Sequence, residues 1–370
     1  MGSGAALRAR LRADVEALSA IERRAATPGD RESAEWVAAR MRDAGVEDVR
    51  IEAFRCHSTW AVPYGAHALL GLLAARLPAP LRIPLALATA ASFEADYTGR
   101  SQALRARLPG AGLGHNVVGR IGRGRRTLVL VAHHDAAHTG WVWDPRFLRS
   151  GRDHARRTGR TPSFIAPALL ALVLVALGLR RIGSALLAAN LGLGVQSALS
   201  ETVPGASDNA TGVAGVLELA RRYAESPPED TEVIVLCPSG EEVGLAGMCQ
   251  WLRIRKGSDP SVNGLLLFVG LDTIGAGEPV VARGESLTGR YRDEDLALVG
   301  PEVPRVVLGA GTDPMAARHA GFPAVSILSW SDGGFTNYHL PTDTPDRVDW
   351  VSVEGCVELA AVTVDRWLAA

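Results

Sequence analysis

Seven acidic and histidine residues, each just after an apolar run or in a loop, are spread over about 200 positions of this 370-residue chain. They are His133, Asp135, Asp208, Glu241, Glu242, Asp272 and His339. Histidine nitrogens and carboxylate oxygens are ligands that zinc takes in proteins, and a spare carboxylate can act as a base toward water. The set therefore predicts a hydrolase site for two metal ions.

The residue types suggest a division of roles. Two ions about 3.5–4 Å apart need a carboxylate between them, because its two oxygens reach both ions and its charge offsets their repulsion. Asp208 is our candidate for this bridge. His133 and Asp272 would complete one site, and Glu242 and His339 the other, with room left for a water.

Two acidic residues remain for catalysis. Glu241 directly precedes the candidate ligand Glu242, so it is held near the ions without binding one and can take a proton from the attacking water. Asp135 follows His133 by two positions and is placed to hydrogen-bond the second ring nitrogen of that ligand. We expect no organic cofactor.

Six segments carrying these residues resemble the co-catalytic di-zinc aminopeptidases of peptidase family 28 (clan MH), relatives of glutaminyl cyclases and glutamate carboxypeptidases. In order they are VAHHDA, GASDNATGVAGVLELAR, SGEEVGLAG, GLDTIGAG, GTDPMAARHAGFPAV and YHLPTDTPDRVD. The likeness covers roughly residues 30–55, 114–140 and 200–370. It implies the same five ligands, the same base and the same supporting aspartate.

The chain departs from the family pattern in two places. It has Thr312, Asp313 and Pro314 where members often have Ser-Asp-His, so a histidine that can contact substrate is absent. We expect these residues and those at 330–335 to shape the specificity pocket. His133 and Asp208 are 75 positions apart, more than is usual in the family, so an insertion lies between them.

Hydrophobic patterning predicts the elements that position the site. Helices are expected at 7–24, 31–44, 211–223, 243–253, 313–319 and 351–367, and strands at 49–54, 116–122, 127–133, 232–237, 264–272 and 323–328. Alternating strands and helices predict an α/β fold with a mixed, mostly parallel sheet covered on both faces. The candidate ligands follow the carboxyl ends of strands, where such sheets place their sites.

Two apolar stretches do not fit this core. We expect residues 1–56, 114–140 and 201–370 to form the catalytic domain, and 57–113 and 141–200 to be inserted helical hairpins. The run Ser163–Leu179 has no charged residue over 17 positions, which is near the lower limit for crossing a membrane.

The patterning favours membrane insertion of 163–200, and less strongly of 61–93, which arginines and prolines interrupt. A soluble lid or dimer-forming helical layer remains the alternative. The arginine-rich segment 146–160, most simply a solvated and flexible stretch, would place the catalytic domain in the cytoplasm by the positive-inside rule. A soluble cytoplasmic protein is the other reading.

Composition limits the remaining classes. The net charge of −1 argues against nucleic-acid binding. The four cysteines lack a CxxC spacing and fit a reducing compartment, with Cys237 in a core strand. The N-terminal segment has no apolar stretch typical of a secretory signal. The oligomeric state stays open.

We therefore expect a metalloexopeptidase, an aminopeptidase that cleaves peptides by attack of a metal-bridging water. Two alternatives stay open. A glutaminyl-cyclase-like cyclotransferase would need only one zinc, whereas both predicted sites are complete. A non-catalytic membrane scaffold of the same fold would have lost a ligand or the base, and neither is lost here.

Overall fold

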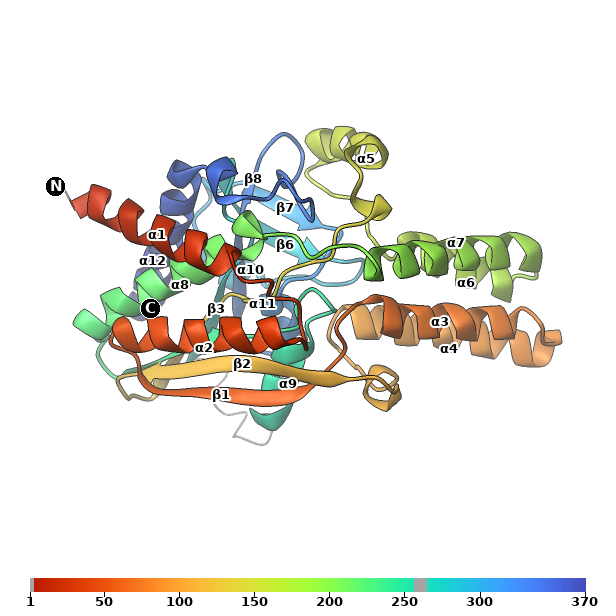
Figure 1. Cartoon of the computed structure of the whole chain (residues 1–370), viewed down its shortest axis with the longest axis horizontal. Coiled ribbons are helices and arrows are strands. Elements are labelled where there is room, and N and C mark those ends of the chain that lie inside the picture. Colours follow the sequence, from red (N-terminus) through yellow and green to blue (C-terminus); the bar gives the residue numbers. More distant parts are fainter. Residues whose placement is uncertain (1–2, 256–264) are drawn as a thin grey trace.

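The computed structural model describes residues 3–255 and 265–370. Its centre is an eight-stranded sheet in the order β1-β2-β4-β3-β5-β8-β6-β7 (Figure 1). The strands are β1 Glu47–Cys56, β2 Gly112–Ile121, β3 Arg126–Val131, β4 Thr231–Cys237, β5 Leu266–Leu271, β6 Glu278–Glu285, β7 Arg305–Leu308 and β8 Ala324–Trp330.

The middle of the sheet is parallel. Strand β3 pairs in parallel with β4 and β5, and β5 with β8, whereas β1, β2 and β6 introduce antiparallel pairs. The continuous apolar runs of β3 and β5 are buried, as expected for strands covered on both faces. The predicted mixed, mostly parallel sheet is confirmed; the first residue of the strand predicted at 264–272 lies outside the described residues.

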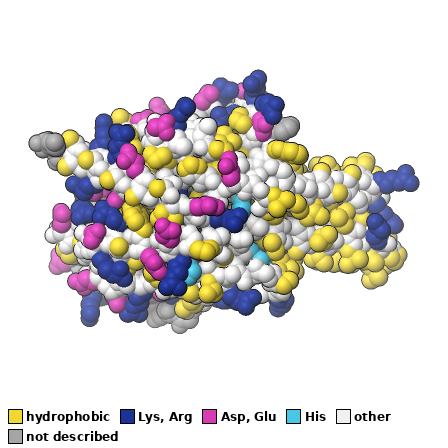
Figure 2. Space-filling view, in the orientation of Figure 1, with side chains coloured by type: hydrophobic (Ala, Val, Ile, Leu, Met, Phe, Trp, Pro, Cys, Tyr) yellow, Lys and Arg dark blue, Asp and Glu magenta, His cyan; other side chains and the backbone are white. Residues whose placement is uncertain are grey.

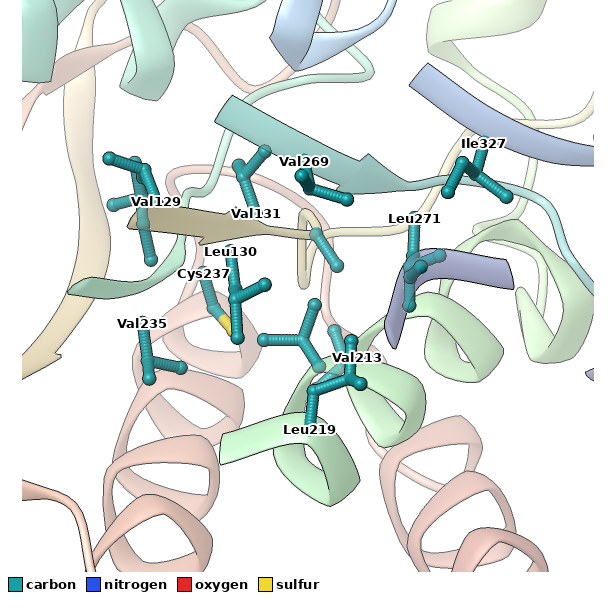
Figure 3. Close-up of a cluster of buried hydrophobic side chains, with 14 of the residues drawn as sticks. Val129, Leu130, Val131, Val213, Leu219, Val235, Cys237, Val269, Leu271 and Ile327 are labelled. Carbon is teal, nitrogen blue, oxygen red and sulfur yellow. The ribbon is translucent and has the colours of Figure 1, made fainter. Parts of the chain in front are cut away.

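Helices cover both faces of this sheet. One group is α1 Ser3–Ser19, α2 Pro28–Asp43, α8 Thr211–Glu225 and α12 Trp350–Ala369; the other is α9 Ala246–Arg255, α10 Asp293–Ala297 and α11 Asp313–His319. Neighbouring residues of β5 distinguish the faces, because Leu271 meets α8 at Gly215 whereas Gly270 leaves room for Pro314 of α11. Figure 3 shows side chains of β3, β4 and β5 packed toward α8, with Cys237 in the core as predicted.

Four further helices project from one end of the sheet (Figure 1). These are α3 Ala61–Ala74, α4 Ala79–Tyr97, α6 Ala166–Ala176 and α7 Arg180–Ala198. They pack around a small core of alanines with Leu172, Val175 and Leu187. We call them the projecting bundle. Its outer surface is rich in hydrophobic side chains and carries basic ones at its far end (Figure 2).

The prediction of transmembrane hairpins at 61–93 and 163–200 is not supported, since within the described residues no helix is both long and apolar enough to cross a bilayer. The apolar run from 163 is helical only over the 11 residues of α6. At 1.5 Å per residue this covers roughly half of a ~30 Å hydrocarbon layer. Helix α7 begins with Arg180 and Arg181, and α4 contains Arg82.

The arginine-rich segment is also different from the flexible stretch expected. It forms α5, Pro145–Thr158, which Asp144 caps at its start and Gly159 ends in a left-handed conformation. Arg152 donates to the carbonyl of Phe335, and Arg156 pairs with Asp332. These contacts hold the helix against the loop after β8.

Candidate metal centre

Three parallel strands bring four of the candidate residues to one edge of the sheet. His133 follows β3, Glu241 and Glu242 follow β4, and Asp272 directly follows β5. Because β4, β3 and β5 are parallel neighbours, their carboxyl ends meet at the same edge. Asp208 reaches this edge from the turn before α8, at Ala206–Ala210. His339 comes from the loop between β8 and α12.

The predicted ligands form two groups that share Asp208. His133 Nε2 lies 3.3 Å from Asp208 Oδ1 and 3.8 Å from Asp272 Oδ2. His339 Nε2 lies 3.1 Å from Asp208 Oδ2 and 3.1 Å from Glu242 Oε2. Within each group, one donor atom per residue lies within 4.8 Å of the others. One carboxylate thus faces two sets of donors through its two oxygens.

Several donor atoms of the two groups have no hydrogen-bond partner, as expected for atoms that bind a cation. Glu242 Oε1 is buried without a hydrogen-bond partner among the described residues. His133 Nε2 and His339 Nε2 are buried too, and the carboxylate oxygens near them are not aligned to accept a hydrogen bond. Buried polar atoms without a partner are uncommon in folded proteins, because each costs about 1–3 kcal/mol of desolvation. The chemistry of this donor set, imidazole with carboxylate, is that of zinc sites.

Electrostatics points the same way. Burial, together with the neighbouring charge of Asp208, raises the pKa of Glu242 to about 7 and that of Asp272 to about 6. Burial opposes protonation of His339, but the charges of Glu242 and Asp208 raise its pKa to about 10. The cluster therefore holds more negative charge than its surroundings balance, and positive ions would relieve the repulsion.

Asp135 lies beside His133 and also makes a contact that the sequence did not predict, with the backbone of the two glutamates. The ring N–H at His133 Nδ1 donates to the backbone oxygen of Asp135 at 3.3 Å, while the carboxylate lies 3.4 Å from the same nitrogen. That carboxylate accepts the backbone N–H groups of Glu241 and Glu242 at 3.1 and 3.2 Å. Asp135 thus ties the turn carrying both glutamates to the loop carrying His133.

Glu241 lies beside the two donor groups that share Asp208, and with His133 and Glu242 it forms a third possible group of donors. Its Oε2 is 3.9 Å from His133 Nε2, and its side chain is 12% exposed. Burial, with the nearby charges of Asp272 and Glu242, raises its pKa well above the ordinary value. It borders the cavity described below, so it can reach a molecule bound there.

Asp343 and Arg23, which the sequence did not single out, hold the Asp208 turn by hydrogen bonds. Asp343 accepts the backbone N–H groups of Ser207 and Asp208 at 2.9 and 3.1 Å. Arg23, fully buried, donates to the carbonyls of Pro204 and Gly205, both at 2.5 Å.

Asn209 joins this turn to the end of β5. Its side-chain oxygen accepts from Thr273 and its amide donates to the carbonyl of Leu271 at 2.9 Å. The position of Asp208 relative to Asp272 is therefore fixed by hydrogen bonds. The only sequence signal for Asp343 was its place four residues after His339 in YHLPTDTP.

We predict that Asp343→Ala destabilises the protein. The carboxylate is 2% exposed, and its removal leaves two buried N–H groups without an acceptor, at about 1–3 kcal/mol each. Chemical denaturation should show a loss of about 2–6 kcal/mol. The control is Asp346→Ala, since Asp346 lies on the surface three residues away. Equal stability of the two variants would contradict the role of Asp343.

A cavity of about 510 Å³ opens beside the donor groups, with Glu241, Glu242 and His339 in its wall. Of the residues expected at 330–335, those at 333–335 line it and those at 330–332 do not. Residues 309–311 line it in place of the expected Thr312–Pro314. Thr312 instead donates to the buried carboxylate of Glu285. We call this space the outer cavity.

Comparisons with known proteins agree with the resemblance. Residues 191–364 match the model described as peptidase family M28, a range holding all the candidate residues except His133 and Asp135. An aminopeptidase from Aneurinibacillus sp. strain AM-1 has a similar structure, with 14% identity, a TM-score of 0.56, and 96% of this chain and 93% of that chain covered.

Two further solved structures share the fold. A zinc aminopeptidase from Bacillus subtilis has 15% identity and a TM-score of 0.55, covering 96% of this chain and 94% of that chain. A glutaminyl cyclase from Bacteroides thetaiotaomicron has 14% identity and a TM-score of 0.55, covering 96% of each chain. At these identities the likeness establishes the fold.

Proposed function

We propose that this chain, in which residues 191–364 match the model of peptidase family M28, is a zinc-dependent aminopeptidase that removes N-terminal residues from peptides. The observation that carries the proposal is the pair of buried donor groups sharing Asp208, with Glu241 beside them at the wall of a large cavity. The aminopeptidases of similar fold lend further support.

In this proposal two zinc ions are held by five residues. His133 and Asp272 would bind one, Glu242 and His339 the other, and Asp208 both. Bound zinc would polarise the substrate carbonyl and make water acidic enough to ionise near neutral pH. The chain must then place the scissile amide and manage the protons.

Glu241 is our candidate for the proton carrier. It takes a proton from the water that forms the new C–O bond, and returns it to the amine nitrogen as the C–N bond breaks. Asp135 keeps this glutamate in reach by accepting its backbone N–H. The free α-ammonium of the substrate is attracted to the carboxylates around the donor groups.

The two alternatives differ in measurable ways. A cyclotransferase would release ammonia from N-terminal glutamine with one zinc per chain, whereas an aminopeptidase would release free amino acids with two. A scaffold would do neither. Metal content combined with aminoacyl-anilide and glutaminyl-peptide substrates therefore tests the proposal. Ammonia release without anilide cleavage would overturn it.

We predict that chelation inactivates and destabilises the enzyme. Zinc at about 100 times its dissociation constant stabilises a protein by about 2.7 kcal/mol. For a chain of 370 residues, the loss of each ion should lower the melting temperature by roughly 3–4 °C. Adding back two equivalents of zinc should restore both melting temperature and turnover. The Asp208→Ala variant is the control, because chelation should barely shift its melting curve.

A further inference from the structure

A large cavity lined by arginines lies apart from the metal centre. It has a volume of about 860 Å³, and we call it the basic cavity. The end of β1, the segment after α4 and the helices α9 and α11 surround it. Its lining contains no aspartate or glutamate among the described residues, but five arginines: Arg55, Arg100, Arg105, Arg107 and Arg253. A cavity with such a lining attracts anions.

Two of these five arginines are already paired with carboxylates. Arg105 pairs with the buried Asp96 at 2.5 Å. Arg100, which is more exposed, pairs with Glu94 at 3.0 Å. The charges of these two arginines are therefore balanced within the protein.

The other three arginines have no acidic partner in the part of the chain that the structure describes. Arg107 donates to the carbonyl of Ala103, and Arg253 donates to the side chain of Gln250. The side chain of Arg55 makes no hydrogen bond or ion pair there. All three are exposed and come from different elements, namely the segment after α4, α9 and β1. Three like charges around one cavity repel one another, and a bound anion would relieve this repulsion.

The floor of the basic cavity is fixed to the chain that follows the two glutamates of the metal centre. Gln102 donates to the carbonyl of Gly244 at 2.6 Å, and the buried Arg105 donates to the carbonyl of Val243. Gly244 borders the outer cavity, whereas Ala246 borders the basic cavity. The two cavities thus border the same segment but, within the described residues, share no lining residue. A ligand in the basic cavity would have a site of its own.

The size and charge of the basic cavity indicate the chemistry of its ligand. Its volume lies in the range of about 300–1,000 Å³ that is typical of sites for small molecules. One phosphate group carries a charge of about −1.5 to −2 near neutral pH, so two such groups would balance the three unpaired arginines. The planar guanidinium group matches phosphate by two parallel hydrogen bonds. Because the arginines come from three elements, phosphates at separate positions on one molecule suit them better than a single phosphate.

We propose that the basic cavity binds a small soluble molecule with at least two phosphate groups. This ligand would contact none of the candidate zinc ligands, because none of them lines the basic cavity. The site is therefore distinct from the substrate site proposed above. Its test does not depend on whether the chain hydrolyses peptides.

Calorimetry with fructose 1,6-bisphosphate and the zinc-loaded full chain tests this site. We expect one bisphosphate to bind per chain. Inorganic phosphate should bind at least about tenfold more weakly, because it reaches fewer arginines. Fructose without phosphate groups should not bind. If inorganic phosphate bound as tightly as the bisphosphate, or if neither bound, the inference would be overturned.

Removing the unpaired arginines should weaken the binding of the bisphosphate. Each of Arg55→Gln, Arg107→Gln and Arg253→Gln should raise its dissociation constant by about fivefold, and the triple variant by about 100-fold. The matched control is Arg123→Gln, because Arg123 is exposed between β2 and β3 and has no ion pair among the described residues. The control removes the same charge and should bind like the wild type. Equal affinity of the triple variant and the control would contradict the site.

Two further measurements distinguish this site from other sources of phosphate binding. Zinc itself attracts phosphate, so the bisphosphate is also titrated into Asp208→Ala and into chelated wild type, which should both hold little zinc. Unchanged affinity would support the basic cavity, whereas loss of binding in both would place the ligand at the metal centre and overturn the inference. Sedimentation with vesicles of phosphatidylcholine and phosphatidylglycerol tests a lipid headgroup. If the wild type bound these vesicles but not the bisphosphate, the inference would be overturned in favour of a membrane lipid.

Discussion

Glu241→Gln should keep the fold and both zinc ions but lose turnover by about 10²–10⁴-fold, the usual contribution of a general base. The substitution keeps the shape of the side chain and leaves the backbone N–H of residue 241 bonded to Asp135. It removes the negative charge and the ability to carry a proton. The fall should therefore lie in kcat, with KM nearly unchanged, when leucyl-anilide hydrolysis is followed.

The neighbouring glutamate provides the comparison for this experiment. Glu242→Gln removes a charged donor from the group that includes His339 and Asp208, so zinc should be lost along with activity. Elemental analysis of zinc per chain distinguishes the two variants, whose substitutions lie at neighbouring positions. A Glu241→Gln enzyme with near-normal kcat, or one lacking zinc, would show that the proton carrier is another group.

The Asp208→Ala variant is expected to bind little zinc at either site. The two oxygens of the Asp208 carboxylate face different histidines, at 3.3 Å from His133 and 3.1 Å from His339. One substitution therefore removes a donor from both groups. It also removes the negative charge that would separate two cations. Zinc per chain should fall from about two toward zero at stoichiometric supply, and turnover should fall with it.

His339→Ala tests whether the sharing of Asp208 is real. This histidine belongs to one donor group only, so its loss should empty mainly that site and leave about one zinc per chain. If Asp208→Ala still bound two ions, a different residue would have to bridge them. If both variants lost both ions equally, the two sites would fill only together.

The sequence by itself was enough to predict six of the eight strands and the residues that follow the central ones. Strands β3, β4 and β5 are continuous apolar runs, which only a buried strand or helix explains, and their length selects strand. Acidic and histidine residues directly after such runs must lie at the same edge when the strands are parallel. Local order therefore carried the information about His133, Glu242 and Asp272.

Weaker elements were not visible in the sequence. Strand β7 has only four residues, and β6 mixes a proline and a glycine with charged side chains, so neither gives a periodic signal. The arginine-rich helix α5 was missed because like charges disfavour an isolated helix. Contacts to Phe335 and Asp332, 183 and 176 positions away, hold it in place.

The packing of the two apolar stretches against each other was decided by tertiary structure. The sequence of an apolar helix has the same hydropathy whether lipid, another helix or a second chain covers it. Hydropathy alone therefore does not distinguish these three cases. The fold packs α6 and α7 against α3 and α4 and places the ring of Trp143 beside His339. Asp343 and Arg23 likewise hold the Asp208 turn by hydrogen bonds between segments more than 130 positions apart. Sequence order records which groups can do chemistry, but contacts between distant segments exist only once the chain has folded.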